Sequence, residues 1–126
     1  MTFEITHVEN GATPNEEKVW LKATAPFNTK GFAIVDRTFD ESGELSNEFR
    51  HIYVFPEIAL EKDQIVILRT GKGKNGIAKF TDTDEEYHRL YWGSESCVWN
   101  DNGGDTATLI SFIKVNSKPV PSVKKK

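Results

Sequence analysis

The residues with the clearest potential for chemistry lie in a glycine-rich segment near the middle of the chain. Gly71, Gly73 and Gly76 satisfy the pattern G-x-G-x-x-G, which in dinucleotide-binding proteins brings backbone amides against a pyrophosphate. That chemistry requires a helix to begin at the last glycine, and residues 77–84 carry no helical period. A P-loop is excluded as well, because Gly76 is not followed by Lys and then Ser or Thr. The spacing therefore does not predict a nucleotide site.

The same segment is rich in positive charge. Arg69, Lys72, Lys74 and Lys79 occur close together in the sequence. A basic, glycine-rich loop can hold phosphate groups through Coulomb attraction and exposed amides. A loop that is simply solvated is the alternative interpretation.

No combination of residues in the sequence demands a reaction. The histidines His7, His51 and His88 are isolated, no serine lies in a G-x-S-x-G setting, and neither C-x-x-C nor H-E-x-x-H occurs. Residues 82–86 resemble the opening of a calcium loop but lack its central glycine and closing glutamate. We therefore expect no enzyme, no metal site and no cofactor. His51, which lies among aromatic residues, is expected to be a hydrogen-bonded core or rim residue.

Three aromatic residues are candidate anchors for a partner. Trp20 lies between Lys18 and Lys22 in an alternating segment, where it could stack on a base or sugar or pack beneath a neighbouring loop. Exposed aromatic side chains concentrate binding energy in protein interfaces. Trp20, Tyr91 and Trp92 are therefore candidate protein-binding residues. Lys18 and Lys22 join the basic residues of the glycine-rich segment as candidate nucleic-acid-binding residues.

Length and composition indicate one domain whose surface carries both positive and negative charges. The chain has 126 residues, of which 14 are Trp, Tyr or Phe, and these suffice for a core without a metal or a disulfide. The net charge of -3 argues against a dedicated nucleic-acid coat, although it allows a local basic patch. A single cysteine, Cys97, excludes an intramolecular disulfide and fits a reducing compartment. No signal peptide or membrane-length apolar window is present, which favours a cytoplasmic location unless the chain is a domain cut from a longer protein.

Short β-strands are the elements expected to position these residues. Apolar residues alternate with others in four segments, at residues 17–23, 32–37, 49–55 and 106–113, and residues 3–8 are a candidate short strand. Residues 65–68 are apolar on both faces, as in a central strand. The pattern predicts an antiparallel β-sandwich or barrel over residues 1–116, followed by an extended, mobile tail at 117–126. The lysines of this tail could touch anionic surfaces.

Two hairpins are predicted from turn-forming residues. Residues 91–110 read as a strand, a tight turn and a second strand, because Asn-Asp-Asn-Gly-Gly-Asp at 100–105 holds residue types that tolerate positive φ or bond to nearby amides. Residues 40–48 are predicted to form an acidic hairpin tip.

Five short motifs occur in order along most of the chain. The match runs from about Val19 to Leu109, and the first motif begins at Glu17. They are E-K-V-W-L at 17–21, G-F-A-I-V-D at 31–36, Y-V-F-P at 53–56 with Leu60 and Gln64, T-G-K-G at 70–73, and W-N-D-N-G-G-D at 99–105 with Leu109. In this order they resemble the lamin tail domain, the immunoglobulin-like β-sandwich of nuclear lamins and many bacterial proteins. Phe32 stands where the family usually has tryptophan, and Asp63 where it usually has glycine. Residues 111–115 run on where the family has a turn.

The resemblance implies a non-catalytic adaptor of the bacterial type, either stand-alone or excised. Lamin tail domains contact proteins and, in lamins, DNA or chromatin. The first hypothesis is a domain that binds protein through sheet edges, loops and the aromatic residues Trp20, Tyr91 and Trp92. The alternative is weak, sequence-independent DNA binding by the six basic residues, with Trp20 stacking on bases. Carbohydrate binding through Trp20 and Trp92 has no other support in the sequence.

Overall fold

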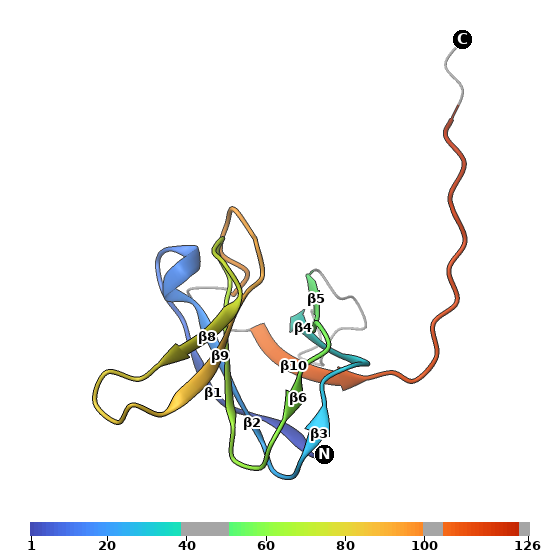
Figure 1. Ribbon diagram of the computed structural model, residues 1–126. Helices are drawn as coiled ribbons and strands as arrows, with labels where there is room; N and C mark the ends of the chain where they lie inside the picture. The colour runs from blue at the N-terminus through green and yellow to red at the C-terminus, as the bar shows by residue number, and fades with distance from the viewer. Residues whose placement is uncertain (39–50, 100–104, 124–126) are drawn as a thin grey trace.

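The computed structural model describes residues 1–38, 51–99 and 105–123. Within these ranges the regular structure is β-strand apart from one short 3-10 helix (Figure 1). The elements are, in order, β1 (Phe3–Glu9), η1 (Pro14–Glu16), β2 (Lys18–Ala23), β3 (Phe27–Asn28), β4 (Phe32–Thr38), β5 (Ile52–Val54), β6 (Ala59–Leu60), β7 (Ile65–Arg69), β8 (Gly76–Lys79), β9 (Glu86–Tyr91) and β10 (Asp105–Ser111). The predicted all-β class is confirmed.

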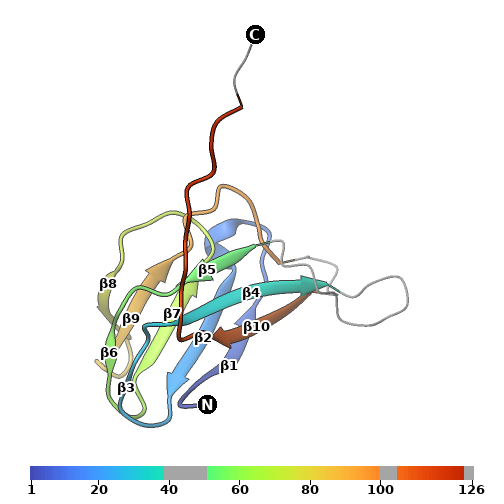
Figure 2. The same cartoon turned by 90° about the vertical axis from the view of Figure 1, so that its right-hand side faces the viewer.

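The strands form two larger sheets and one short pair. The five-stranded sheet has the order β1-β2-β7-β9-β8, the three-stranded sheet has the order β10-β4-β5, and β3 pairs with β6. Figures 1 and 2 show the two larger sheets as the layers of a sandwich. The edge strands β1 and β10 are in contact, whereas β8 and β5 are the edges on the other side. The predicted β-sandwich is confirmed.

One pair of neighbouring strands departs from the predicted antiparallel arrangement. β7 and β9 run parallel, with Ile65 opposite Tyr87 and Arg69 opposite Tyr91. Residues 70–75 carry the chain past the next position in the sheet, so β8 forms the edge and β9 returns between β7 and β8. β8 runs opposite to β7, and β9 runs opposite to β8, so β9 has the same direction as β7. Alternation indicates strands without giving their order, so it could not predict this one parallel pair within a sandwich whose other strand pairs are antiparallel.

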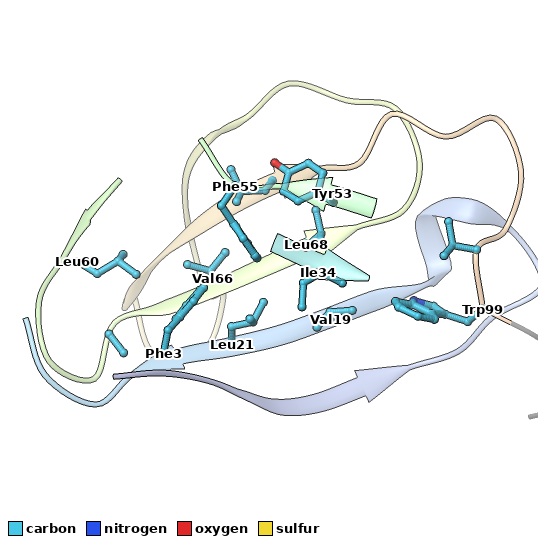
Figure 3. Packing of buried hydrophobic residues seen from close by; sticks show 13 residues of the cluster. Phe3, Val19, Leu21, Ile34, Tyr53, Phe55, Leu60, Val66, Leu68 and Trp99 are labelled. Carbon is cyan, nitrogen blue, oxygen red and sulfur yellow. The ribbon is translucent and has the colours of Figure 1, made fainter. Parts of the chain in front are cut away.

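The hydrophobic core lies between the two sheets (Figure 3). In β2 the buried residues Val19 and Leu21 face the core, while Trp20 lies on the outer face, as the alternation predicts. β7 contributes Val66 and Leu68 to the core, and its three central residues are buried, which fits a central strand. Each such aliphatic side chain contributes about 1.5–3 kcal/mol when fully buried.

Aromatic rings close one end of this core. The Phe3 ring centroid lies 5.1 Å from that of Phe27, 5.8 Å from Phe32 and 5.4 Å from Phe55. These rings come from β1, β3, β4 and the segment after β5. Tilted and edge-on pairs at such distances add about 0.5–1.5 kcal/mol each beyond area burial. The cluster therefore ties the two sheets together where β3 and β6 meet.

The predicted hairpin over residues 91–110 is wrong. β9 ends at Tyr91, residues 92–99 contain no strand, and β10 pairs with β4 in the other sheet. The chain thus crosses from one sheet to the other in this stretch. Turn-forming residues suit such a crossing as well as they suit a hairpin. The predicted turn at 100–104 and the predicted acidic tip at 40–48 lie outside the described residues.

A buried carboxylate holds the crossing segment in place. Glu17 has no exposed surface, and its carboxylate oxygens accept hydrogen bonds from the backbone amides of Val98 at 2.8 Å and Trp99 at 3.1 Å. The side chains of Val98 and Trp99 are part of the core. The Trp92 amide donates to the Arg69 carbonyl at 2.7 Å. These contacts supply the hydrogen-bond partners that a hairpin strand would otherwise provide.

Candidate binding site

An apolar groove lies at the edge of the five-stranded sheet, beside β8. Its volume is about 330 Å³, close to the lower end of the range of roughly 300–1,000 Å³ for ligand pockets. Its walls include Pro56, Ile58, Gly76, Ile77, His88 and Leu90. The first two residues follow β5, and the others belong to β8 and β9. The groove therefore lies where the two sheets separate.

Ile77 is the exposed wall of the groove. Its side chain is 60% exposed, although it lies within a strand, whereas Leu90 is only 2% exposed and belongs to the core. In the described part of the chain β8 has one neighbour, β9, so its other edge presents unpaired backbone groups. An exposed apolar side chain beside an unpaired strand edge is suited to strand addition.

Polar groups at the groove are few. Glu57 accepts a hydrogen bond from the Asn28 side chain at 3.1 Å, and the Asn75 side-chain oxygen accepts one from the Tyr91 amide at 2.9 Å. Burial lowers the pKa of His88 below its ordinary value, and the charge of Glu86 partly opposes this change. The neutral imidazole is therefore favoured, and His88 adds no positive charge at neutral pH.

Trp20 is held by neighbours on the outer face of the five-stranded sheet. Its ring stacks on Phe80, with centroids 5.9 Å apart and planes 14° from parallel. The indole Nε1 donates to the Glu9 carboxylate at 3.1 Å. Phe80 follows β8 and also packs on Tyr87, with centroids 4.5 Å apart. Of the two sequence interpretations, packing beneath a neighbouring segment describes this geometry.

Tyr91 and Trp92 do not form one surface. Trp92 packs on the core, with its ring centroid 5.7 Å from that of Tyr53 and 6.1 Å from that of Trp99. Tyr91 lies against Gly73, and the Arg69 guanidinium is 5.9 Å from the centre of its ring. Trp92 therefore supports the core, and Tyr91 supports the glycine-rich loop.

The glycines of the G-x-G-x-x-G pattern have structural explanations. A Cβ atom on Gly71 would lie 2.2 Å from the side-chain oxygen of Asn15, and one on Gly73 would lie 2.4 Å from the Tyr91 ring. Gly76 begins strand β8 where a nucleotide site would need a helix. Two of the three glycines thus allow close packing around the loop.

The six candidate basic residues are not gathered into one patch. Lys18 and Arg69 are opposite each other on the outer face, and Lys22 lies at the other end of β2. Strand alternation places Lys79 on the opposite face of this sheet. Three of the six have acidic partners, in the pairs Lys18–Glu9 at 3.8 Å, Lys22–Asp63 at 3.5 Å and Lys72–Glu95 at 2.8 Å. Lys74, like Lys72, lies in the connection between β7 and β8.

A buried acid on β4 contacts a histidine that precedes β5. Asp36 accepts a hydrogen bond from the His51 backbone amide, and its other carboxylate oxygen lies 2.9 Å from His51 Nδ1. This is the hydrogen-bonded role predicted for His51. Over residues 1–38, 51–99 and 105–123 no three His, Cys, Asp or Glu side chains are arranged to hold a metal ion. In the same ranges no helix is long and apolar enough to span a membrane.

The chain matches nothing in comparisons with known proteins. No family model, no curated protein and no solved structure gave a match. The resemblance to lamin tail domains therefore depends on the sequence motifs alone.

The groove has no signature in the sequence. Its walls come from separate segments, at residues 56–58, at 75–77, and at 88 and 90, and apart from Glu57, Asn75 and His88 they are ordinary apolar or small residues. The one local signal is Ile77, a large apolar residue between Gly76 and Ala78 in a polar stretch. Because the strand order could not be read from alternation, this residue could not be placed at a sheet edge.

Proposed function

We propose that the chain is a non-catalytic binding domain that takes up an extended protein segment along β8. The observation that carries this proposal is an unpaired strand edge beside an apolar groove of about 330 Å³. A segment added to β8 would form main-chain hydrogen bonds, and every second side chain would enter the groove near Ile77 and Leu90. Backbone pairing supplies affinity, and the groove selects apolar side chains.

DNA binding is the weaker proposal. Acidic groups lie within 4 Å of Lys18, Lys22 and Lys72, which reduces the positive potential that a phosphate backbone needs. Trp20 already has Phe80 stacked on one face of its ring. Charge-driven binding to DNA would fall steeply with rising salt, whereas an apolar contact would change little.

Membership of the lamin tail family is part of the proposal. The motif residues Val19, Leu21 and Trp99 are in the core, and Glu17 and Asp36 are buried. This placement agrees with the expectation that the motifs determine a fold and do not form a site. An immunoglobulin-like topology and an adaptor role are what such ancestry would add.

A library of random linear peptides, selected on the immobilised full chain, tests the binding proposal. We expect enriched peptides to carry apolar residues at every second position, because only alternate side chains reach the groove. Their affinity, measured by fluorescence anisotropy, should fall about tenfold or more for Ile77→Lys, since one buried apolar contact is lost.

Val54→Lys is the matched control for this experiment. Val54 is 53% exposed, close to the 60% of Ile77, but it lies on β5 and does not line the groove. Its replacement should leave the affinity unchanged. Selection without enrichment, or peptides that bind Ile77→Lys as tightly as the original chain, would refute the proposal.

A further inference from the structure

The chain contains a segment with the properties of an occupant for the groove. Residues 112–123 follow β10 and contain no regular secondary structure. Figure 1 shows this segment leaving the sandwich on the side away from β8. Apart from the half-buried Phe112, its large apolar side chains are uncovered, with Ile113 95%, Val115 74%, Val120 91% and Val123 92% exposed. Burying such side chains is favourable, so the segment would gain free energy from an apolar surface.

The segment has the two-residue period of a strand. The odd positions carry Ile113, Val115, Ser117, Pro119, Pro121 and Val123. Both lysines of the segment, Lys114 and Lys118, are at even positions. In an extended chain the odd and even side chains lie on opposite faces. One face of the segment is thus almost entirely apolar, and the other carries the charge.

The prolines leave one edge of the segment able to pair. Pro119 and Pro121 are both at odd positions and have no N–H to donate. Successive residues of a strand direct their backbone groups to opposite edges, so the even positions keep a complete set of donors on one edge. The segment can therefore add to a strand through one edge, while the other edge resists further pairing.

Charge favours the same pairing. Residues 112–126 contain five lysines and no acidic residue, so residues 1–111 carry 19 acidic and 11 basic residues, a formal charge of -8. The connection from β8 to β9 carries Asp82, Asp84 and Glu85. A segment added to β8 would pass this connection, and opposite charges closer than about 8–10 Å attract with little screening at ordinary salt.

We propose that residues 113–123 of one copy add to β8 of a second copy, with Ile113 and Val115 in the groove beside Ile77. Each copy gives one segment and accepts one, so two copies that exchange segments satisfy both contacts and close as a dimer, whereas the same contact passed from copy to copy would form an open chain. A second copy is the occupant because the segment leaves its own sandwich on the side away from β8 (Figure 1). The inference rests on the proposed function, since it names the partner of the same groove.

Sedimentation velocity of the full chain over a range of concentrations tests the dimer. The double variant Ile113→Ser with Val115→Ser should raise the dissociation constant about tenfold or more, because two apolar side chains leave the groove. Val120→Ser is the matched control. It removes an equally exposed apolar side chain from the even face, so the dissociation constant should not change.

The groove is tested from the other side of the contact. Ile77→Ser should weaken the dimer about tenfold or more, and Val54→Ser, at a residue of similar exposure on β5, should not. An equimolar mixture of Ile77→Ser and the double tail variant should form a mixed dimer more strongly than either variant pairs with itself. In the mixture one groove and one segment remain intact, whereas each variant alone has no intact contact.

Several results would overturn the inference. A chain that is monomeric at every concentration would do so, as would an equal effect of Val120→Ser and the double variant. Hydrogen exchange that shows residues 112–123 protected in a monomer, with protection lost in Ile77→Ser, would place the segment in its own groove and exclude the second copy. If the chain is monomeric but library peptides still bind through Ile77, the inference fails and the proposed function stands.

Discussion

Glu17 keeps a carboxylate with no exposed surface, and the hydrogen-bond partners of its oxygens are backbone amides. Its own carbonyl accepts a bond from the Thr70 amide at 3.1 Å. One residue thus connects the start of β2 to the end of β7 and to the segment that crosses between the sheets. A carboxylate suits this position because it offers only acceptors to two converging donors.

Glu17→Gln should lower the free energy of unfolding by about 1–3 kcal/mol, because one amide would then face the side-chain NH₂ group without an acceptor. Urea denaturation monitored by tryptophan fluorescence measures the loss. Glu16→Gln is the control, since Glu16 is exposed and only accepts a bond from the Thr13 hydroxyl at 2.8 Å. A loss for Glu17→Gln no larger than that for the control would contradict this account.

The ionisation of Tyr53 makes the free energy of unfolding depend on pH in the alkaline range. Burial raises the pKa of Tyr53 from 10.0 to about 12, because the phenolate is poorly solvated between the sheets. The unfolded chain therefore loses this proton first. The stabilising contribution is complete below pH 10 and is lost as the pH rises toward 12.

Tyr53→Phe should remove this contribution. The free energy of unfolding of the original chain should fall more steeply than that of Tyr53→Phe as the pH rises from 10 to 12. Urea denaturation at successive pH values measures both curves. Parallel curves for the two proteins would mean that Tyr53 ionises normally in the folded chain.

At the scale of elements, the connection from β7 to β8 decides the unusual strand order. It carries the chain past β9 and packs Gly73 on Tyr91, at the end of that strand. Gly73→Ala should lower the free energy of unfolding by about 1–3 kcal/mol, because the new Cβ overlaps the ring. Gly76→Ala should change it by less than about 0.5 kcal/mol, since the nearest side-chain atom is 4.0 Å away. Thermal denaturation compares the two, and equal stability would show that the loop can move off the ring.

The elements also show what the sequence could predict. The faces of β2 follow from Val19, Trp20 and Leu21, because alternation is a local property. The parallel pairing of β7 and β9 could not be predicted, because it depends on β9 returning inside β8. The crossing after Tyr91 was hidden for a similar reason, since its backbone partners, such as Glu17, lie far away in the sequence.

The candidate site, too, could be predicted from the sequence only in part. Trp20 is on the outer face, as predicted, but its stacking on Phe80 depends on the β8–β9 connection reaching β2. Trp92 and Tyr91 are adjacent in sequence, yet one supports the core and the other a loop. Predicting the groove would have required the relative positions of the two sheets, and no single segment of the sequence contains that information.

At the scale of the whole molecule, the C-terminal segment is basic and the rest of the chain has a net negative charge. Residues 112–126 carry five lysines, while residues 1–111 have a formal charge of -8. On the sandwich, Glu9 and Asp63 lie beside Lys18 and Lys22. Exposed pairs of this kind add little stability, but they reduce the local potential that would attract a polyanion. Any affinity for DNA should therefore depend on the C-terminal lysines.

This separation predicts how the chain behaves with DNA. At low salt, fluorescence anisotropy with a labelled duplex should detect at most weak binding that falls with salt at a slope of no more than about five released counterions, one for each C-terminal lysine. Replacing these five lysines with serine should abolish it. Replacing Lys18 and Lys22 with serine should leave the affinity within about twofold, because each already has an acidic neighbour that offsets its charge. If the second replacement removes binding and the first does not, the outer face of the five-stranded sheet is a DNA surface, and the basic residues of β2 act through their charge despite Glu9 and Asp63.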